Sequence, residues 1–134
     1  MIKQLAHLCI NSPDLDATSK FYCGALGLEK GFEFQRDGAL FGYYLKLGSN
    51  TFIEVFQGEA GPEGNIRHLA IEVDDIDAVI AHLREAGYEA TEKKLGADHS
   101  WQSWTTDPSG VRIEFHEYTN NSLQLNGGVC HVNW

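Results

Sequence analysis

The stretch HLCINSPDLDA (His7–Ala17) decides the fold, because the chain repeats it closely as HLAIEVDDIDA (His68–Ala78). Every residue of the second copy lies 61 positions after its equivalent in the first. A shorter echo closes each copy, where FIEVF (Phe52–Phe56) is matched by RIEFH (Arg112–His116). A repeat of this kind indicates that two copies of one structural unit are joined in a single chain.

Each copy predicts a strand, a helix and then three strands. In the first copy, apolar alternation and turn residues predict strands at Lys3–Ser12, Leu28–Gln35, Leu40–Leu47 and Asn50–Gln57. Helical spacing predicts a helix at Pro13–Leu26, with Ser12 as its N-cap and Pro13 as its first residue. The short separators that contain Gly38 and Gly48 are typical of hairpins, so the last three strands should form an antiparallel meander.

The second copy predicts the same order of elements. Its strands are expected at Ile66–Val73, Tyr88–Lys94, Trp101–Thr106 and Val111–Tyr118, and its helix at Asp75–Ala86, ended by Gly87. We therefore predict one domain over residues 1–134, with module one at 1–58, a glycine-rich linker at 58–64, module two at 65–118 and a tail at 119–134. The tail predicts no regular element.

The alternation along the strands also predicts which side chains face a shared cavity. His7 and His68 lie on the strand face opposite to the apolar residues that would pack under the helices. Glu54 has apolar neighbours on both sides, where an unpaired carboxylate would be costly, and Glu114 holds the equivalent place in the second copy. Two histidines and two glutamates at equivalent repeat positions indicate a metal site.

Other polar residues are weaker candidates for the cavity. His116 shares a face with Glu114, so it is a candidate acid or pocket residue. Asp98 and His99 lie in a loop that could cover the cavity. In a regular strand only one of Trp101 and Trp104 can face the cavity, because the two point to opposite sides.

The paired strand–helix–three-strand pattern resembles the vicinal-oxygen-chelate superfamily over nearly the whole chain, and its glyoxalase I-like members in particular. His7, Glu54, His68 and Glu114 match the metal ligands of those proteins one for one. The resemblance implies an α+β fold in which two tandem βαβββ modules form a curved mixed sheet around a metal cavity. It also implies one divalent metal with two positions left open for neighbouring substrate oxygens.

The ligand types agree with that implication, since imidazole and carboxylate together suit Ni, Zn, Co, Mn or Fe(II). We expect a glyoxalase I-type lyase or isomerase that moves a proton through a metal-chelated enediolate of a small hydroxy-carbonyl or thiohemiacetal substrate. Glu114 is the expected main base, and Glu54 its partner on the other side. The alternatives are a metal-dependent epimerase or extradiol dioxygenase of the same superfamily, and a metal-free drug-binding protein of the bleomycin-resistance type.

The net charge and the composition limit the classes of partner that the protein can bind. The net charge of −9 argues against binding to nucleic acid or to an anionic membrane, because both need a basic surface. The sequence shows no signal peptide or membrane span, and its three cysteines are typical of free thiols, so we expect a cytoplasmic protein that binds a small molecule. The chain has no evident basic cluster for glutathione. A homodimer that exchanges its halves across the linker is possible.

Overall fold

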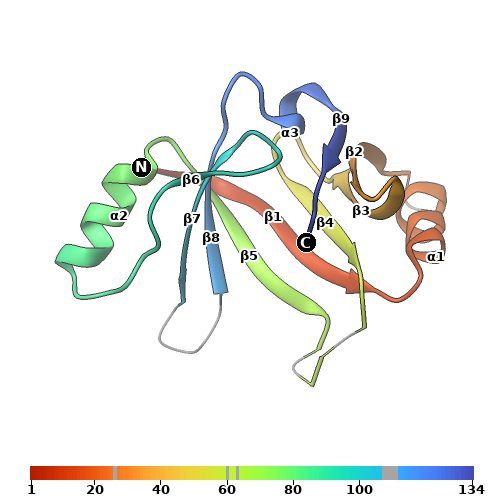
Figure 1. Ribbon diagram of the computed structural model, residues 1–134, viewed down its shortest axis with the longest axis horizontal. Coiled ribbons are helices and arrows are strands. Elements are labelled where there is room, and N and C mark those ends of the chain that lie inside the picture. Colours follow the sequence, from red (N-terminus) through yellow and green to blue (C-terminus); the bar gives the residue numbers. More distant parts are fainter. Residues whose placement is uncertain (26, 60, 63, 107–111) are drawn as a thin grey trace.

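The computed structural model describes residues 1–25, 27–59, 61–62, 64–106 and 112–134. Within these residues one mixed sheet has the strand order β6-β7-β8-β5-β1-β4-β3-β2-β9. The first module contains β1 (Ile2–Ser12), α1 (Leu15–Ser19), a π-helical turn η1 (Lys20–Ala25), β2 (Glu29–Arg36), β3 (Ala39–Lys46) and β4 (Phe52–Gln57). The second contains β5 (Ile66–Val73), α2 (Ile76–Glu85), β6 (Lys94–Leu95), β7 (Trp101–Thr106) and β8 (Arg112–Glu117). The predicted curved mixed sheet is therefore confirmed (Figure 1).

The two modules meet along their opening strands. β1 and β5 pair antiparallel, with His7 opposite Ala70 and Cys9 opposite His68. Each opening strand also pairs in parallel with the closing strand of its own module, β1 with β4 and β5 with β8. The order of strands on one side of the β1–β5 pair thus mirrors the order on the other, as the internal repeat requires.

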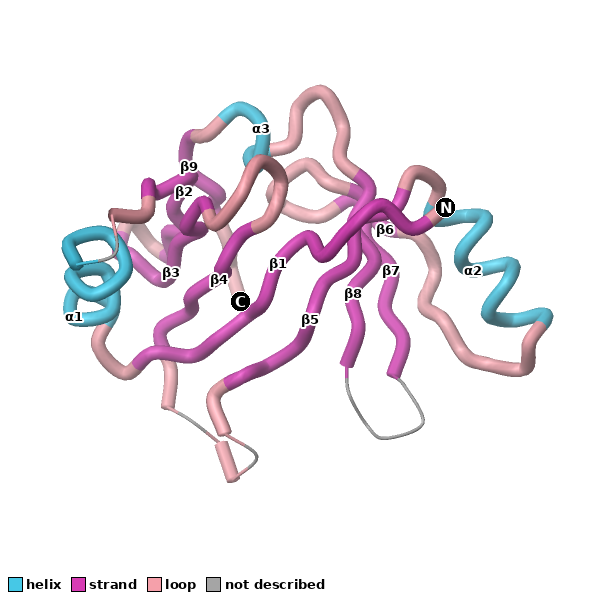
Figure 2. Tube along the Cα trace, turned by 180° about the vertical axis from the view of Figure 1, so that it is seen from behind, coloured by secondary structure: helices cyan, strands magenta, loops and turns pink. Residues whose placement is uncertain are grey.

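Helix α2 is formed as the sequence predicts. Asp75 is its N-cap and accepts a hydrogen bond from the backbone nitrogen of Ala78 at 3.1 Å. Its apolar face, with Ile76 fully buried, packs against Phe115 and Val73 of the sheet. Figures 1 and 2 place α2 at one end of the curved sheet and α1 at the other, so neither helix blocks the middle of the sheet.

The first helix differs from the prediction at both ends. Its N-cap is Asp14, whose carboxylate accepts a hydrogen bond from the Ala17 nitrogen at 2.9 Å, and not Ser12. The Ser12 hydroxyl is used elsewhere, because it lies 2.6 Å from the Thr18 hydroxyl. Five residues of α-helix are then followed by the wider π-helical turn η1, and Leu26 lies outside the described residues.

The prediction of a strand at Tyr88–Lys94 is wrong, since only Lys94–Leu95 pairs with β7. The Thr91 nitrogen donates to the Trp104 carbonyl at 2.9 Å, and beyond this backbone bond hydroxyl side chains take the place of a regular ladder. Thr91 accepts a hydrogen bond from the Trp104 nitrogen at 2.8 Å, and Ser103 and Thr105 donate to backbone carbonyls of the segment. Side-chain hydrogen bonds of this kind satisfy backbone groups without regular strand pairing.

The tail forms two short elements that the sequence did not predict: α3 (Leu123–Asn126) and β9 (Gly128–His131). Strand β9 adds to the edge of the sheet, in parallel with β2. Figure 1 shows α3 and β9 on the side of the sheet where the loop after β6 also lies. Four-residue elements carry too little periodicity to be recognised in a sequence, and contacts with the rest of the fold decide them.

The cysteines and the absence of a membrane span were also predicted from the sequence. All three cysteines are free, as expected. Among the described residues, no helix combines the length and the apolar character that crossing a membrane requires. The segment 107–110, which joins the last two predicted strands, and the first residue of the strand predicted at Val111–Tyr118 lie outside the described residues.

Candidate metal centre

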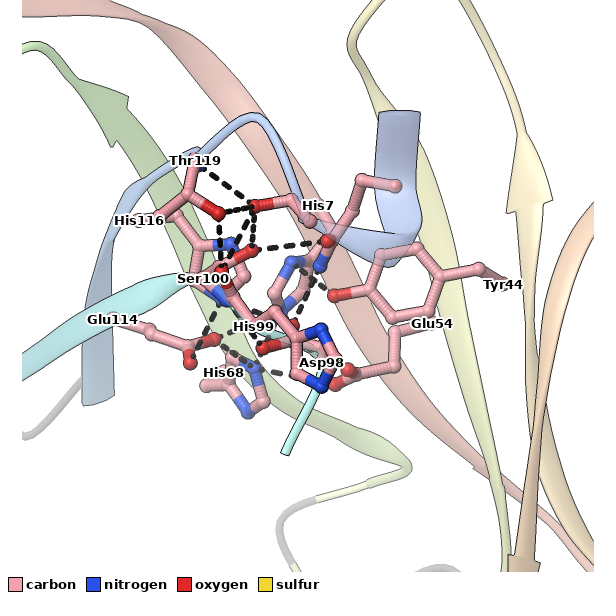
Figure 3. A network of polar contacts seen from close by, with 12 residues as sticks. His7, Tyr44, Glu54, His68, Asp98, His99, Ser100, Glu114, His116 and Thr119 are labelled. Carbon is pink, nitrogen blue, oxygen red and sulfur yellow. Dashed lines mark hydrogen bonds and ion pairs between the residues drawn. The ribbon is translucent and has the colours of Figure 1, made fainter. Parts of the chain in front are cut away.

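The fold brings together the two histidines and two glutamates that the sequence singles out. His7 and His68 come from the central pair β1 and β5, while Glu54 comes from β4 and Glu114 from β8 (Figure 3). Cys9 pairs with both His68 and Glu54, and its repeat equivalent Ala70 pairs with both His7 and Glu114. Two small side chains therefore separate the histidines from the glutamates.

The side-chain tips converge on one point. His7 Nε2 lies 2.9 Å from His68 Nε2. Glu114 Oε2 is 3.0 Å from His7 Nε2 and 3.3 Å from His68 Nε2. Glu54 Oε1 is 3.5 Å from the first of these nitrogens and 3.6 Å from the second. Four potential ligand atoms thus face the same small space, which confirms that the repeat places them together.

These separations fit a single metal ion. An ion about 2.1 Å from each ligand atom holds neighbouring ligands about 3.0 Å apart at a right angle, and about 3.4 Å apart at a tetrahedral angle. The five separations that involve a histidine nitrogen run from 2.9 to 3.6 Å. Two imidazole nitrogens and two carboxylate oxygens are also a donor set that divalent transition metals favour. The residues present therefore fit a divalent metal.

The charge of the cluster also suits a cation. Glu54 and Glu114 are buried, with 7% and 4% of their surface exposed, and His7 is fully buried. Among the described residues, no lysine or arginine forms an ion pair with either carboxylate. Buried carboxylates that lack a lysine or arginine partner are costly, and a bound metal ion would lower that cost.

Tyr44 on β3 orients one of the histidines. Its hydroxyl lies 2.8 Å from His7 Nδ1, on the side of the ring away from the cluster, and its side chain is fully buried. Burial holds the pKa of Tyr44 well above its usual value, so the hydroxyl keeps its proton. When His7 Nε2 serves as a ligand, the ring proton must be on Nδ1, and it is then donated to the Tyr44 oxygen.

Replacing Tyr44 with phenylalanine should weaken metal binding about tenfold, because partners that orient a ligating histidine are typically worth 10- to 100-fold in affinity. Isothermal titration with Ni²⁺ or Zn²⁺ measures the change. Tyr43→Phe is the matched control, since the Tyr43 hydroxyl donates to the Leu15 carbonyl and does not contact the cluster. Equal affinities of the Tyr44→Phe and wild-type proteins would show that the hydroxyl does not support His7.

His116 stands behind Glu114. Its Nε2 lies 3.2 Å from Glu114 Oε1 and 3.9 Å from Asp98 Oδ2, and the side chain is buried. Burial alone lowers the pKa of His116, but the Glu114 charge and hydrogen bond outweigh it and raise this pKa to about 9. Burial likewise raises the pKa of Glu114, while His116, His68 and His7 together hold it well below its usual value. The sequence indicated His116 only by its shared face with Glu114.

Cys9 lines the cavity but is not suited to be a ligand. Burial, together with the nearby charge of Glu54, raises the pKa of its thiol well above the usual value. Among the described residues, Cys9 belongs to neither of the groups of side chains whose ligand atoms lie close enough together to hold a metal ion. Cys9 is a small residue that pairs with both His68 and Glu54, so it leaves room for their larger side chains.

The cluster opens into a cavity of about 850 Å³. Glu54, His68 and Glu114 form part of its lining. Trp104 also lines it, with its ring 4.8 Å from the His68 ring, whereas Trp101 packs against the apolar cluster under α2. One tryptophan of the two therefore faces the cavity, as strand geometry predicted.

Basic residues at the cavity are a feature that the sequence did not reveal. Arg67 from β5, Lys94 from β6 and Arg112 from β8 all line it. The guanidinium of Arg112 lies 4.6 Å from the centre of the Trp104 ring. These three cations are spread over 46 residues of sequence numbering, 67 to 112, so no local cluster marks them; only the sheet brings them together.

Comparison with known proteins identifies the family. The model of the Glyoxalase/Bleomycin resistance protein/Dioxygenase superfamily matches residues 4–115, which include all four residues of the cluster. The chain belongs to this superfamily. The resemblance expected from the repeat and its His and Glu residues is therefore confirmed.

Two relatives within the superfamily are more than 30% identical to this chain. YaeR, an uncharacterized protein of Escherichia coli strain K12, is 32% identical over 127 residues, covering 87% of this chain and 97% of that protein. An ethylmalonyl-CoA/methylmalonyl-CoA epimerase of Cereibacter sphaeroides is 34% identical over 112 residues, covering 72% and 83%. Both matches extend over most of the chain.

Solved structures of the superfamily have the same fold. The crystal structure of methylmalonyl-CoA epimerase from Mycobacterium tuberculosis superposes with a TM-score of 0.74 at 25% identity, covering 88% of this chain and 89% of that one. The relatives from Cereibacter sphaeroides and Mycobacterium tuberculosis both carry the name of an epimerase. They support the superfamily prediction, and they give no support to its narrower glyoxalase I form.

Proposed function

We propose that this member of the superfamily is a metal-dependent isomerase that moves a proton on the carbon next to a carbonyl group. The observation that carries the proposal is the placement of Glu54 and Glu114. Both approach the two histidine nitrogens, and they come from opposite sides of the central strand pair. A carboxylate on each side allows a proton to leave one face of a substrate carbon and return to the other.

His7, His68, Glu54 and Glu114 would hold the metal. When bound, a divalent metal polarises a carbonyl oxygen of the substrate and lowers the cost of removing the neighbouring proton. The protein contributes the fixed geometry: the two histidines lie on the central strands, and Tyr44 orients His7. Burial of His7, Glu54 and Glu114 keeps bulk water away from their side chains, which strengthens their electrostatic interactions.

Glu114 is the proposed main base. One of its oxygens faces the histidine pair, while the other lies 3.2 Å from His116. This second contact fixes the carboxylate, while the charge of His116, together with the hydrogen bonds of the three histidines, outweighs burial and lowers the pKa of Glu114, so its role as the base depends on position and not on high basicity. Glu54 has Cys9 next to it and no imidazole apart from the two of the cluster among the described residues. The unequal surroundings support unequal roles, with Glu54 acting on the opposite face.

An acyl thioester is the proposed substrate class. The epimerase relative, 34% identical, acts by its name on ethylmalonyl-CoA and methylmalonyl-CoA. Arg67, Lys94 and Arg112 line the cavity and would attract an anionic group of the substrate. Glu92 and Asp98 line the same cavity, so the cations would act at their own positions and do not make the whole cavity basic.

A glyoxalase I-type lyase is the second candidate. It rests on the same proton transfer and on the match of His7, Glu54, His68 and Glu114 to the ligands of glyoxalase I-like proteins, which the sequence indicates. A glutathione hemithioacetal carries two carboxylates, which the three cavity cations could also meet. The epimerase and the lyase would use the same carboxylate as the base, and they would differ in the product that they form.

Proton exchange in D₂O tests the proposal. Protein loaded with Ni²⁺, Co²⁺ or Zn²⁺ is incubated with methylmalonyl-CoA in one reaction and with a glutathione hemithioacetal in another, and both are followed by NMR. Deuterium at the carbon next to the thioester, with loss of stereochemical purity, is the expected result, and a chelator should abolish it. Conversion of the hemithioacetal alone would favour the lyase. Absence of metal-dependent exchange in both reactions would contradict the proposal.

A further inference from the structure

The tail lies outside the repeat and outside residues 4–115 that match the superfamily model, yet it forms part of the cavity. Cys130, Asn133 and Trp134 all line the cavity that holds the candidate metal centre. A segment that the shared fold does not require, and that reaches the site, is a candidate for choosing among substrates.

One end of the tail is fixed to module one. Strand β9 pairs with β2, and the Val132 nitrogen donates to the Gln35 carbonyl at 3.0 Å. Arg36 then donates to the Trp134 carbonyl oxygen at 3.2 Å, while its guanidinium lies 4.2 Å from the centre of the Phe41 ring. These contacts hold the Trp134 backbone at the edge of the cavity.

The other end of the tail is fixed to module two. The Leu123 nitrogen donates to the Asp98 carbonyl at 2.9 Å, and Gln124 Nε2 donates to the Asp98 carboxylate at 2.6 Å. The Ser100 hydroxyl lies 2.8 Å from Ser122 Oγ and 3.0 Å from Gln124 Oε1, within hydrogen-bond distance of both. The tail thus runs from the loop after β6, where it contacts Asp98, to β2 of the opposite module (Figure 2).

Four aromatic rings meet where the tail reaches module one. We call Phe34, Phe41, Phe56 and Trp134 the aromatic wall. The Trp134 ring lies 5.3 Å from Phe56, 5.8 Å from Phe41 and 6.2 Å from Phe34, measured between ring centres. All four residues line the cavity. Trp134 remains 57% exposed, so much of its surface is available to a ligand.

The aromatic wall stands next to the metal centre. Phe56 follows Glu54 by two residues on the same face of β4, which places the two side chains about 7 Å apart along the strand. Gly42 on β3 makes room for the Phe56 ring, because a Cβ on Gly42 would lie 2.7 Å from Phe56 Cδ1 and 2.3 Å from the Val55 carbonyl oxygen. The position of the ring is therefore built into two strands.

The two sides of the cavity differ in charge. Among the described residues that line it, module one and the tail contribute one charged side chain, Glu54 of the metal cluster. The cations Arg67, Lys94 and Arg112 all come from module two. Module two also contributes the carboxylates of Glu92, Asp98 and Glu114, so a molecule held at the metal centre would have an uncharged aromatic surface on one side and a surface of mixed charge on the other.

We propose that the aromatic wall binds a hydrocarbon substituent, aliphatic or aromatic, of the molecule whose oxygens are held at the metal centre, and that Trp134 sets its size. The inference rests on the metal centre of the proposed function and adds the class of substituent. Burying hydrocarbon against aromatic rings is favourable by about 25 cal/mol per Å². A substituent the size of a phenyl group should therefore add roughly tenfold or more to affinity.

Hydroxamic acids test this subsite without any turnover, because they present two neighbouring oxygens to a metal and can carry different substituents. Isothermal titration of Ni²⁺-loaded protein compares acetohydroxamate with phenylacetohydroxamate. In the wild type, the phenyl compound should bind about tenfold more tightly. Trp134→Ala should remove most of that difference and leave acetohydroxamate binding unchanged. Trp134→Phe should restore part of it.

Leu125→Ala is the matched control, since Leu125 is an exposed apolar residue of the same tail and does not line the cavity. It should behave as the wild type, and thermal unfolding checks that every variant is folded. Equal binding of both hydroxamates to the wild type, or unchanged discrimination in Trp134→Ala, would overturn the subsite alone. Failure of acetohydroxamate to bind metal-loaded wild-type protein would overturn the chelating centre of the proposed function, and the subsite with it.

Discussion

His7→Ala should bind a divalent metal about 100-fold more weakly than the wild-type protein. Four ligands share a binding free energy on the order of 10 kcal/mol, so the loss of one costs more than 2 kcal/mol. The alanine also leaves Glu114 without the imidazole that lies 3.0 Å away. Metal content by mass spectrometry, on protein purified without chelator, should fall from about one ion per chain to a trace.

His82→Ala is the control for this experiment. His82 lies on the exposed face of α2, where its Nδ1 is 3.1 Å from the Ala78 carbonyl, so its loss should not change metal content. A second measurement is thermal unfolding with and without added metal, which should stabilise the wild type and His82→Ala, and leave His7→Ala unchanged. Full metal content in His7→Ala would mean that the four residues do not form the site.

Glu114→Gln should reduce metal-dependent proton exchange about 1,000-fold, within the 10²- to 10⁴-fold range of a positioned general base. Glutamine keeps an oxygen of the same size near His7 and His68 but cannot take up a proton at neutral pH. The metal content should therefore fall less than in His7→Ala, which separates the role of base from the role of ligand. Exchange in D₂O under saturating metal measures the effect.

Glu54→Gln is the matched comparison, because it makes the same change at the equivalent repeat position. It should lower the exchange rate less than Glu114→Gln, since no His116 equivalent stands behind Glu54 among the described residues. A larger loss in Glu54→Gln would reverse the assignment of the main base. An unchanged exchange rate in both variants would exclude carboxylate base catalysis at this centre.

The internal repeat was enough to predict that the two histidines and two glutamates of the cluster lie together. An offset of 61 residues requires His7 and His68 to occupy equivalent places, and two strands joined about a twofold axis must bring equivalent residues close together. The burial of Glu54 among apolar neighbours followed from strand alternation in the same way. These inferences succeed because strand periodicity and the repeat are both visible in the sequence without knowledge of which segments pair.

The structure of the segments at the edge of the cavity could not be predicted, because it depends on contacts with segments far away in the sequence. The Tyr88–Lys94 segment has strand-like composition, yet hydroxyl side chains of β7 satisfy its backbone, and pairing begins only at Lys94. The tail has no periodicity, yet its pairing with β2 and its bonds to Asp98 give it a fixed place. Neither result could be predicted from a window of residues, because the partners lie elsewhere in the chain.

The amino-acid sequence thus specifies a paired fold with two histidines and two glutamates at its axis, through repetition and alternation alone. The cations of the cavity and its aromatic wall become visible only in the folded chain. Arg67 and Arg112 lie far apart in sequence, and so do Phe34 and Trp134. No sequence pattern therefore predicts that the two arginines line one cavity or that the two aromatic rings lie close together. Local geometry sets which way each side chain points along a strand, and only the pairing of strands and tail decides what it faces.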